Sequence, residues 1–317
     1  MQTSPTTTGP ADTGAPAHVP AVGHPDLSTV PRIDFLLLAL AVSGVAFSAP
    51  LITATAAPVL AIAFWRNCVA AGVLSPIALL RHRAELRAMD RRTVLLCLAA
   101  GAFLAVHFAM WLPSLRMTSI ASSTALCTIT PLWTTLILRL RGQHVPRSVW
   151  VGCCIAFSGV LVLTGVDFTL SARALAGDGL ALGAGMAASG YFLLGSEVRR
   201  STSTTAYTFV CYSTTAVLLL VGCLASGQAL TGYSGDTWIK ILLLTVAAQF
   251  LGHSLSNRVV RTLGPSLVST AILLETPGAA LIAAVWLGQL PPVAVYPAVA
   301  IVLVGLVVVI RGQQSRS

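Results

Sequence analysis

The sequence has very little charge. Asp, Glu, Lys and Arg together make up 9% of its 317 residues, whereas hydrophobic residues make up 56%. Soluble domains carry roughly 25% charged residues, and a soluble fold of this length could not cover its surface with so few. The composition therefore predicts an integral membrane protein, with the lipid bilayer as its main partner.

The sequence also lacks the motifs of catalysis and metal binding. Its seven cysteines form no Cys-x-x-Cys pair and lie inside apolar runs, which is typical of small buried hydrophobes. It contains no Gly-x-x-x-x-Gly-Lys-Ser/Thr loop for phosphate, no His-Glu-x-x-His and no Gly-x-Ser-x-Gly. We therefore expect no catalytic residue, no metal, no cofactor and no internal drive by ATP.

The ends of the chain differ from the rest. Residues 1–31 are rich in Thr, Pro and Ala, contain no Lys or Arg, and lack the basic and apolar regions of a signal peptide. This segment is predicted to be a disordered cytoplasmic tail, and residues 312–317 a second short cytoplasmic tail.

Between the tails, the chain contains about ten apolar stretches of the length that crosses a bilayer as a helix. The predicted spans lie near 33–53, 57–79, 93–115, 118–140, 148–166, 177–196, 205–226, 238–259, 265–287 and 293–311. With this even number, both termini share one side, which carries fifteen Lys and Arg against three on the other. The positive-inside rule then places both termini in the cytoplasm, in a multi-pass protein of the cell inner membrane. The net charge of +9 indicates an anionic lipid surface rather than nucleic acid.

The chain repeats itself with an offset of 146 residues. Eleven of the 37 residues of Ser123–Gly159 recur at Ser269–Gly305, and the same frame pairs His107 with His253. The predicted repeats are residues 32–167 and 176–311. Because each holds five spans, an odd number, the second must enter the membrane upside down. The predicted fold is therefore all-α, with ten transmembrane helices as two inverted five-helix repeats, an arrangement typical of transporters that work by alternating access.

The chain carries several short motifs, of which Thr-Pro, Gly-Gln and a later Gly recur in the same order in both halves, whereas Phe64-Trp65-Arg66 occurs only in the first half. The motifs are Phe64-Trp65-Arg66, Thr130-Pro131, Gly142-Gln143, Gly159, Glu275-Thr276-Pro277, Gly288-Gln289 and Gly305. In this order the chain resembles the EamA-type transporters of the drug/metabolite transporter superfamily over residues 33–311. The resemblance implies export of amino acids or other small metabolites. Two departures stand out: Gln143 and Gln289 replace the family's usual Glu, and Ile129 occupies the position that matches Glu275.

Only two formal charges are predicted near the middle of a span, Arg66 and Glu275. Charge there is costly and is often functional. The pair either handles substrate or protons, or it is a structural pair that fixes helix packing. Pro131 and Pro277 are predicted within helices, as hinges of the transport motion or as static kinks.

Other polar and aromatic residues within the spans are candidates to line a central cavity. His107 and His253 either line it or pack between helices, and two His without further ligands do not predict a metal site. The remaining candidates are Trp111, Tyr191, Tyr212, Gln249 and Asn257.

The sequence thus predicts a gradient-driven exporter of a small metabolite such as an amino acid, as a monomer or homodimer. A multidrug exporter of lipophilic cations and an integral-membrane lipid or isoprenoid-phosphate enzyme stay as alternatives. The enzyme would need clustered Asp or His at one membrane face, and the sequence does not contain such a cluster.

Overall fold

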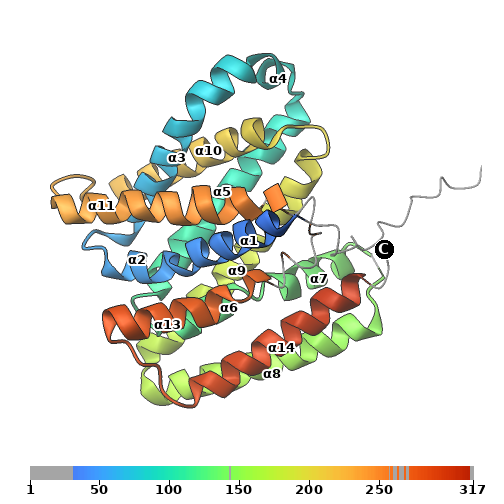
Figure 1. The fold of residues 1–317 in the computed structure, drawn as a ribbon, viewed down its shortest axis with the longest axis vertical. Helices are drawn as coiled ribbons and strands as arrows, with labels where there is room; N and C mark the ends of the chain where they lie inside the picture. Colours follow the sequence, from blue (N-terminus) through green and yellow to red (C-terminus); the bar gives the residue numbers. More distant parts are fainter. Residues whose placement is uncertain are drawn as a thin grey trace, which may run out of the picture.

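The described residues form a bundle of helices (Figure 1). The computed structural model describes residues 31–142, 144–256, 258–259, 263, 268 and 271–314, without the side chains of 163–170, 253–254 and 313–314. The first half forms α1 (Arg32–Ala46), α2 (Ser48–Ala54), α3 (Val59–Arg81), α4 (Arg83–Ala88), α5 (Arg91–Ser114), α6 (Ile120–Cys127), α7 (Thr130–Leu140) and α8 (Arg147–Leu170). The second half forms α9 (Ala172–Val198), α10 (Thr204–Ala225), α11 (Gly235–Leu244), the π-helix η1 (Thr245–Ser254), α13 (Glu275–Leu287) and α14 (Val295–Gln314). Helices suit this apolar chain because they satisfy backbone hydrogen bonds without water.

Polar caps determine where five of these helices begin. The side chains of Asp90, Ser119, Ser171, Ser203 and Ser234 each accept a hydrogen bond from the backbone N–H three residues further on. Such caps satisfy one of the N–H groups that a helix leaves open in its first turn. The capping residues lie in short polar connections between the apolar helices.

Seven helical segments in the described part of the chain are long and apolar enough to cross a membrane, and two shorter apolar helices accompany them. The seven are Arg32–Ala54, Val59–Arg81, Arg91–Ser114, Ile120–Leu140, Ala172–Val198, Thr204–Ala225 and Val295–Gly312, and the shorter two are Arg147–Val162 and Glu275–Leu287. The remaining predicted span, 238–259, falls largely on α11 and η1. The number of ten spans stays a prediction.

Most residues of the two termini lie outside the described part of the chain. The predicted tail at 1–31 lies outside it except for residue 31, and so do residues 315–317. Helix α14 continues to Gln314, which lies within the predicted C-terminal tail at 312–317. The apolar run ends near residue 310, but the helical backbone goes on for one further turn.

The packing of the helices repeats between the two halves. The pair α5–α9 corresponds to η1–α1, the pair α7–α9 to α13–α1, and the pair α5–α10 to α11–α3, and all of these pairs are in contact. The pairs α3–α10 and α8–α14 correspond to themselves and are also in contact. This pattern is that of a pseudo-two-fold axis, which passes between the members of each self-matched pair.

Helices α8 and α14 lie side by side along one edge of the bundle (Figure 1). Glycines at their contact follow the same symmetry. A Cβ added at Gly159 would lie 2.7 Å from the backbone N of Val302, and one added at Gly305 would lie 2.3 Å from the backbone N of Ala156. In the 146-residue frame these are the same contact made twice. The helices approach so closely only because these positions have no side chain.

Two spans are broken near their middle. Helix α6 ends at Cys127 and α7 starts at Thr130, while turn residues at 273–274 precede α13. Pro131 is the second residue of α7 and Pro277 the third residue of α13. We expected these prolines inside continuous helices. They lie instead in the first turn after a break, where the missing N–H of proline leaves no helical bond unmade.

Candidate functional site

A buried guanidinium lies at the centre of the bundle. Arg66, on α3, is only 1% exposed. Its Nε donates a 3.1 Å hydrogen bond to Oε1 of Gln249, and its Cζ lies 4.5 Å from the centre of the Phe108 ring on α5. A cation held by a neutral amide and an aromatic face is stabilised by polar and cation–π contacts, but neither contact supplies a negative charge.

Gln249 reaches Arg66 from the second half of the chain. It is 3% exposed and lies in the middle of η1, where π-helical turns widen the span. The Tyr212 hydroxyl of α10 also hydrogen-bonds Gln249. Arg66 and Tyr212 are separated by 146 residues, so they occupy equivalent positions in the two repeats and are called repeat mates here. They lie on the self-matched pair α3–α10, and both side chains contact the amide of Gln249. Arg66 therefore lies close to the pseudo-two-fold axis.

Glu275 lies near this centre, within electrostatic range of Arg66. It is the first residue of α13, is half-buried, and interacts electrostatically with Arg66 and with the Cys127 thiol. Its carboxylate does not form a contact ion pair with Arg66 among the described residues. The start of a half-helix attracts negative charge through its free N–H groups. The axis thus carries a cation from the first repeat and an acid from the second, near each other but not joined.

Two buried donors in this region have no hydrogen-bond partner among the described residues. They are Nη1 of Arg66 and Nε1 of Trp111, which is 6% exposed. Trp111 follows Phe108 by three residues on α5, so both rings lie on one face of that helix. Buried donors in proteins are almost always paired, so these two atoms need an explanation.

The other sequence candidates have different surroundings. His107 bonds the Ala184 carbonyl through Nδ1 at 3.0 Å and stacks on Trp111 at 5.7 Å, which places it in the packing between α5 and α9. Tyr191 stacks on Tyr207 at 6.2 Å, between α9 and α10. The side chain of His253 and the whole of Asn257 lie outside the described residues.

A cavity of ≈580 Å³ opens along α13. Its walls include Thr53 on α2, Arg116 and Ile120 around the start of α6, and Ala280 and Ala283 on α13. Glu275 precedes Ala280 by five residues, which is about 8 Å along a helix axis. The cavity thus runs along the same helix that carries the central carboxylate, and its volume is in the range of small-molecule sites.

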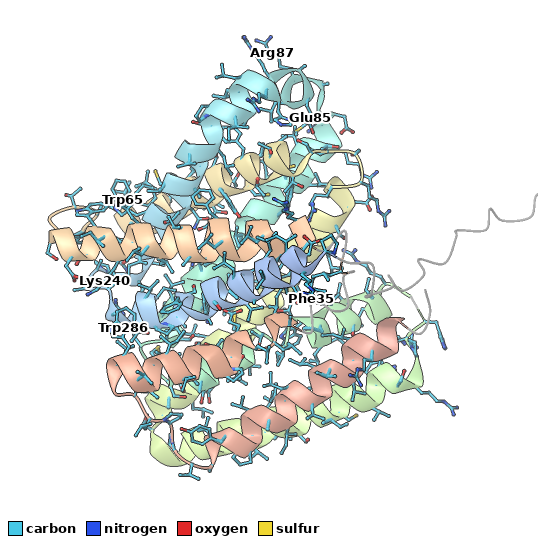
Figure 2. The ribbon with its side chains drawn as sticks, in the orientation of Figure 1. Phe35, Trp65, Glu85, Arg87, Lys240 and Trp286 are labelled. Carbon is cyan, nitrogen blue, oxygen red and sulfur yellow. The ribbon has the colours of Figure 1, made fainter. Side chains whose placement is uncertain are left out.

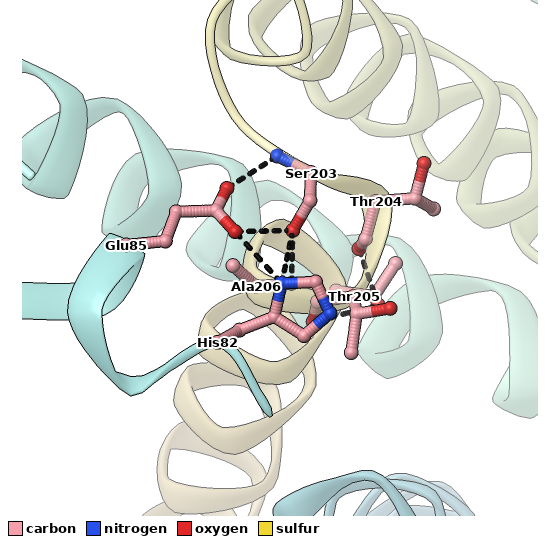
Figure 3. Close-up of polar contacts among 7 residues, drawn as sticks. His82, Glu85, Ser203, Thr204, Thr205 and Ala206 are labelled. Atoms are coloured by element: carbon pink, nitrogen blue, oxygen red, sulfur yellow. Dashed lines mark hydrogen bonds and ion pairs between the residues drawn. The ribbon is translucent and has the colours of Figure 1, made fainter. Parts of the chain in front are cut away.

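A polar cluster joins the ends of α3 and α10 (Figure 3). Glu85 accepts hydrogen bonds from the Ser203 backbone N–H at 2.5 Å and hydroxyl at 2.7 Å, and it pairs with Nδ1 of His82 at 2.8 Å. Partial burial raises the pKa of Glu85, but the hydrogen bonds from Ser203 and His82 outweigh it and hold the pKa below its ordinary value. This cluster was not predicted from the sequence, where its only local signal is a His three residues before a Glu.

Ser, His and an acid also occur together in hydrolases, but the geometry here is different. The Ser203 hydroxyl and the Glu85 carboxylate both contact the same nitrogen of His82. In a catalytic triad the acid binds one ring nitrogen and the serine the other. The cluster therefore serves to cap α10 and tie it to α3.

The opposite end of the same helix pair has an uncharged counterpart. The side-chain oxygen of Gln228 accepts a hydrogen bond from the backbone N–H of Leu60 at 3.3 Å, and the Trp65 indole donates to the Leu230 carbonyl at 2.8 Å. His82 and Gln228 are repeat mates. Figure 2 shows Trp65, Lys240 and Trp286 along one edge, away from Glu85 and Arg87. The pair α3–α10 is thus tied at both ends.

These features define a class of protein. Apolar helices in two related halves, with a buried Arg66 and a half-buried Glu275 near their shared axis, are the architecture of membrane transporters. No group of three or more His, Cys, Asp or Glu that could hold a metal occurs in the part of the chain that the structure describes.

The comparisons give the family. The sequence pattern of the EamA-like transporter family matches residues 32–165 and, a second time, residues 175–311. The chain belongs to this family, a group of membrane transporters. A solved crystal structure of a protein has the same fold, with a TM-score of 0.60 and 16% sequence identity, over 88% of this chain and 97% of that one. The comparison with curated proteins gives no match.

Proposed function

We propose that this protein is a gradient-driven transporter that exports amino acids or similar small metabolites by alternating access. One observation carries the proposal: the buried Arg66 and the half-buried Glu275 come from different repeats and lie together near the axis that relates them. Charges within a membrane bundle are retained mainly for substrate or ion handling.

The arrangement suits a carrier of ten helices in two inverted repeats. When two such halves exchange conformations, a site on their axis opens to one side of the membrane and then to the other. The positive-inside rule places both termini in the cytoplasm and the protein in the cell inner membrane. The sequence contains no phosphate-binding loop, so an ion gradient is the proposed source of energy.

Transport by the purified protein in liposomes tests this proposal. The liposomes are loaded with labelled amino acids or lipophilic cations, and efflux is measured under an imposed proton gradient. We expect efflux of an amino acid, and we expect Glu275→Gln to abolish it or to remove its pH dependence, because the amide keeps the shape and loses the charge. Glu197→Gln is the matched control, since Glu197 is a partly exposed acid that pairs with Arg92 and Arg200.

The outcomes separate the alternatives. Efflux of lipophilic cations in place of amino acids would favour a multidrug exporter. Efflux by Glu275→Gln at the wild-type rate and pH dependence would make the carboxylate structural. Absence of any gradient-dependent efflux would contradict the proposed function itself.

A further inference from the structure

We propose that Arg66 and Trp111 bind the carboxylate of the transported molecule while Glu275 receives its amino group, so that the substrate is a free α-amino acid. This inference rests on the proposed function and names the ligand of the same site. It assigns a partner to each of the two buried donors that lack one.

The hydrogen bonds of Arg66 carry the first step. A guanidinium has five N–H donors and no acceptor. Nε is used by Gln249 and the Phe108 ring faces Cζ, but Nη1 has no partner among the described residues. Both contacts of Arg66 are neutral, so its charge lacks a bonded anion. A carboxylate is the acceptor that matches the planar fork of a guanidinium.

Trp111 supplies the second donor. Its indole N–H has no partner among the described residues, and an indole nitrogen can only donate. Phe108, one helical turn away on the same face of α5, is the ring that contacts Arg66. A carboxylate has two oxygens, so one can accept from Nη1 of Arg66 and the other from Nε1 of Trp111.

The relation between Arg66 and Glu275 decides the overall charge of the ligand. The two groups interact electrostatically but do not form a contact ion pair. A molecule with an anionic and a cationic end can contact both groups and adds no net charge to the membrane interior. A lipophilic cation could use Glu275, but it would meet the charge of Arg66 and leave both donors unpaired.

The cavity along α13 gives such a molecule a path. It reaches Ala280, about 8 Å along the helix axis from Glu275. Arg66 itself is sealed from this cavity in the present conformation, because it is 1% exposed. In this structure the cavity along α13 is therefore open, whereas the site at Arg66 is closed.

Binding of matched compounds tests the inference. The purified full-length protein in detergent is heated with each common L-amino acid, its methyl ester and its N-acetyl derivative, and the shift of the unfolding midpoint gives the Kd. The ester lacks the carboxylate and the N-acetyl compound lacks the amino group. We expect the free acid to bind at least about tenfold more tightly than either derivative, which corresponds to about 1.4 kcal/mol.

Variants assign each end of the ligand to its residue. Arg66→Gln and Trp111→Phe should weaken binding of the acid and leave the ester unchanged. Glu275→Gln should remove the preference over the N-acetyl compound. Trp111→Phe keeps the ring and deletes only the N–H, so it tests the site even if Arg66→Gln does not fold. Arg200→Gln, at an exposed cytoplasmic-side residue, is the control.

Three results would overturn the site: no free acid binds, acid and ester bind equally, or Trp111→Phe leaves their ratio unchanged. A failure of the proposed binding site can be distinguished from a failure of the proposed transport function. Selective binding without efflux from liposomes would contradict the proposed function and keep the site. Efflux without a preference for the free acid over its methyl ester would support the proposed function and contradict the site.

Discussion

The contact between α8 and α14 gives a prediction about stability. In Gly305→Ala, the new Cβ would lie 2.3 Å from the backbone N of Ala156, whereas ordinary contact begins at 3.4 Å, so the helices are about 1.1 Å too close. At the equivalent Gly159 the nearest backbone atom is 2.7 Å away, and the deficit is about 0.7 Å. The obstacle in both cases is backbone, which cannot rotate away as a flexible side chain can.

The size of the effect follows from two opposing terms. Overpacking a tight contact typically costs about 1–3 kcal/mol. Replacing Gly by Ala within a helix returns about 1 kcal/mol through helix propensity. We therefore expect Gly305→Ala to destabilise the fold by up to about 2 kcal/mol. Gly159→Ala should have the same sign and a smaller effect, because its deficit is smaller.

Two other glycines of the chain are matched controls. A Cβ added at Gly72 on α3 or at Gly179 on α9 would meet no atom within 4 Å. Their replacement by Ala should leave the unfolding midpoint in detergent unchanged or slightly higher. If Gly305→Ala is as stable as Gly72→Ala, the close approach of α8 and α14 is wrong, and the repeat symmetry loses its clearest contact.

Two further predictions concern the orientation of the chain and the contact between Glu85 and Ser203. A reporter that is active only outside the cytoplasm, fused after Arg316, should stay silent, and strong activity would overturn the orientation derived from the positive charges. The second concerns the tie between Glu85 and Ser203. The pKa of Glu85 is depressed, so its ionised form stabilises the tie above the ordinary carboxyl pKa of about 4.3, and this is lost as pH falls through the lower folded-state pKa. The protection of the amides at 203–206, measured relative to their intrinsic exchange rates, should therefore fall in acid, and Glu85→Gln should show low protection with little pH response. Equal exchange in both proteins at neutral pH would argue against the tie.

Much of the fold followed from the sequence because the bilayer dictates the length of apolar runs. The predicted stretches fall on the observed helices, and the 146-residue offset recurs in the helix contacts. The breaks after Cys127 and before Glu275 could not be seen, nor could the π-helix around Gln249. Hydropathy reports which side chains are apolar and is insensitive to the register of backbone hydrogen bonds.

The site was predictable only where charge marked it. Arg66 and Glu275 were identified because charge is rare within spans, and the structure places them near each other. Phe108 carried no signal, since a phenylalanine in an apolar helix is ordinary. His107 is the opposite case, because its ring nitrogen is used by the Ala184 carbonyl in helix packing. Which face of a helix meets which neighbour is a property of tertiary packing.

The differences between the halves follow from the position of the site on the axis. Equivalent residues near a two-fold axis lie close to each other, so two identical charges there would repel in a medium of low dielectric. The repeat mate of Arg66 is Tyr212, and that of Glu275 is Ile129. Each charge thus faces a neutral equivalent, and the axis holds one cation and one acid in place of two of each. Residues on the axis also stay near it when the halves exchange conformations. Under the proposed mechanism, the same Arg66 and Glu275 can therefore meet the substrate from either side of the membrane.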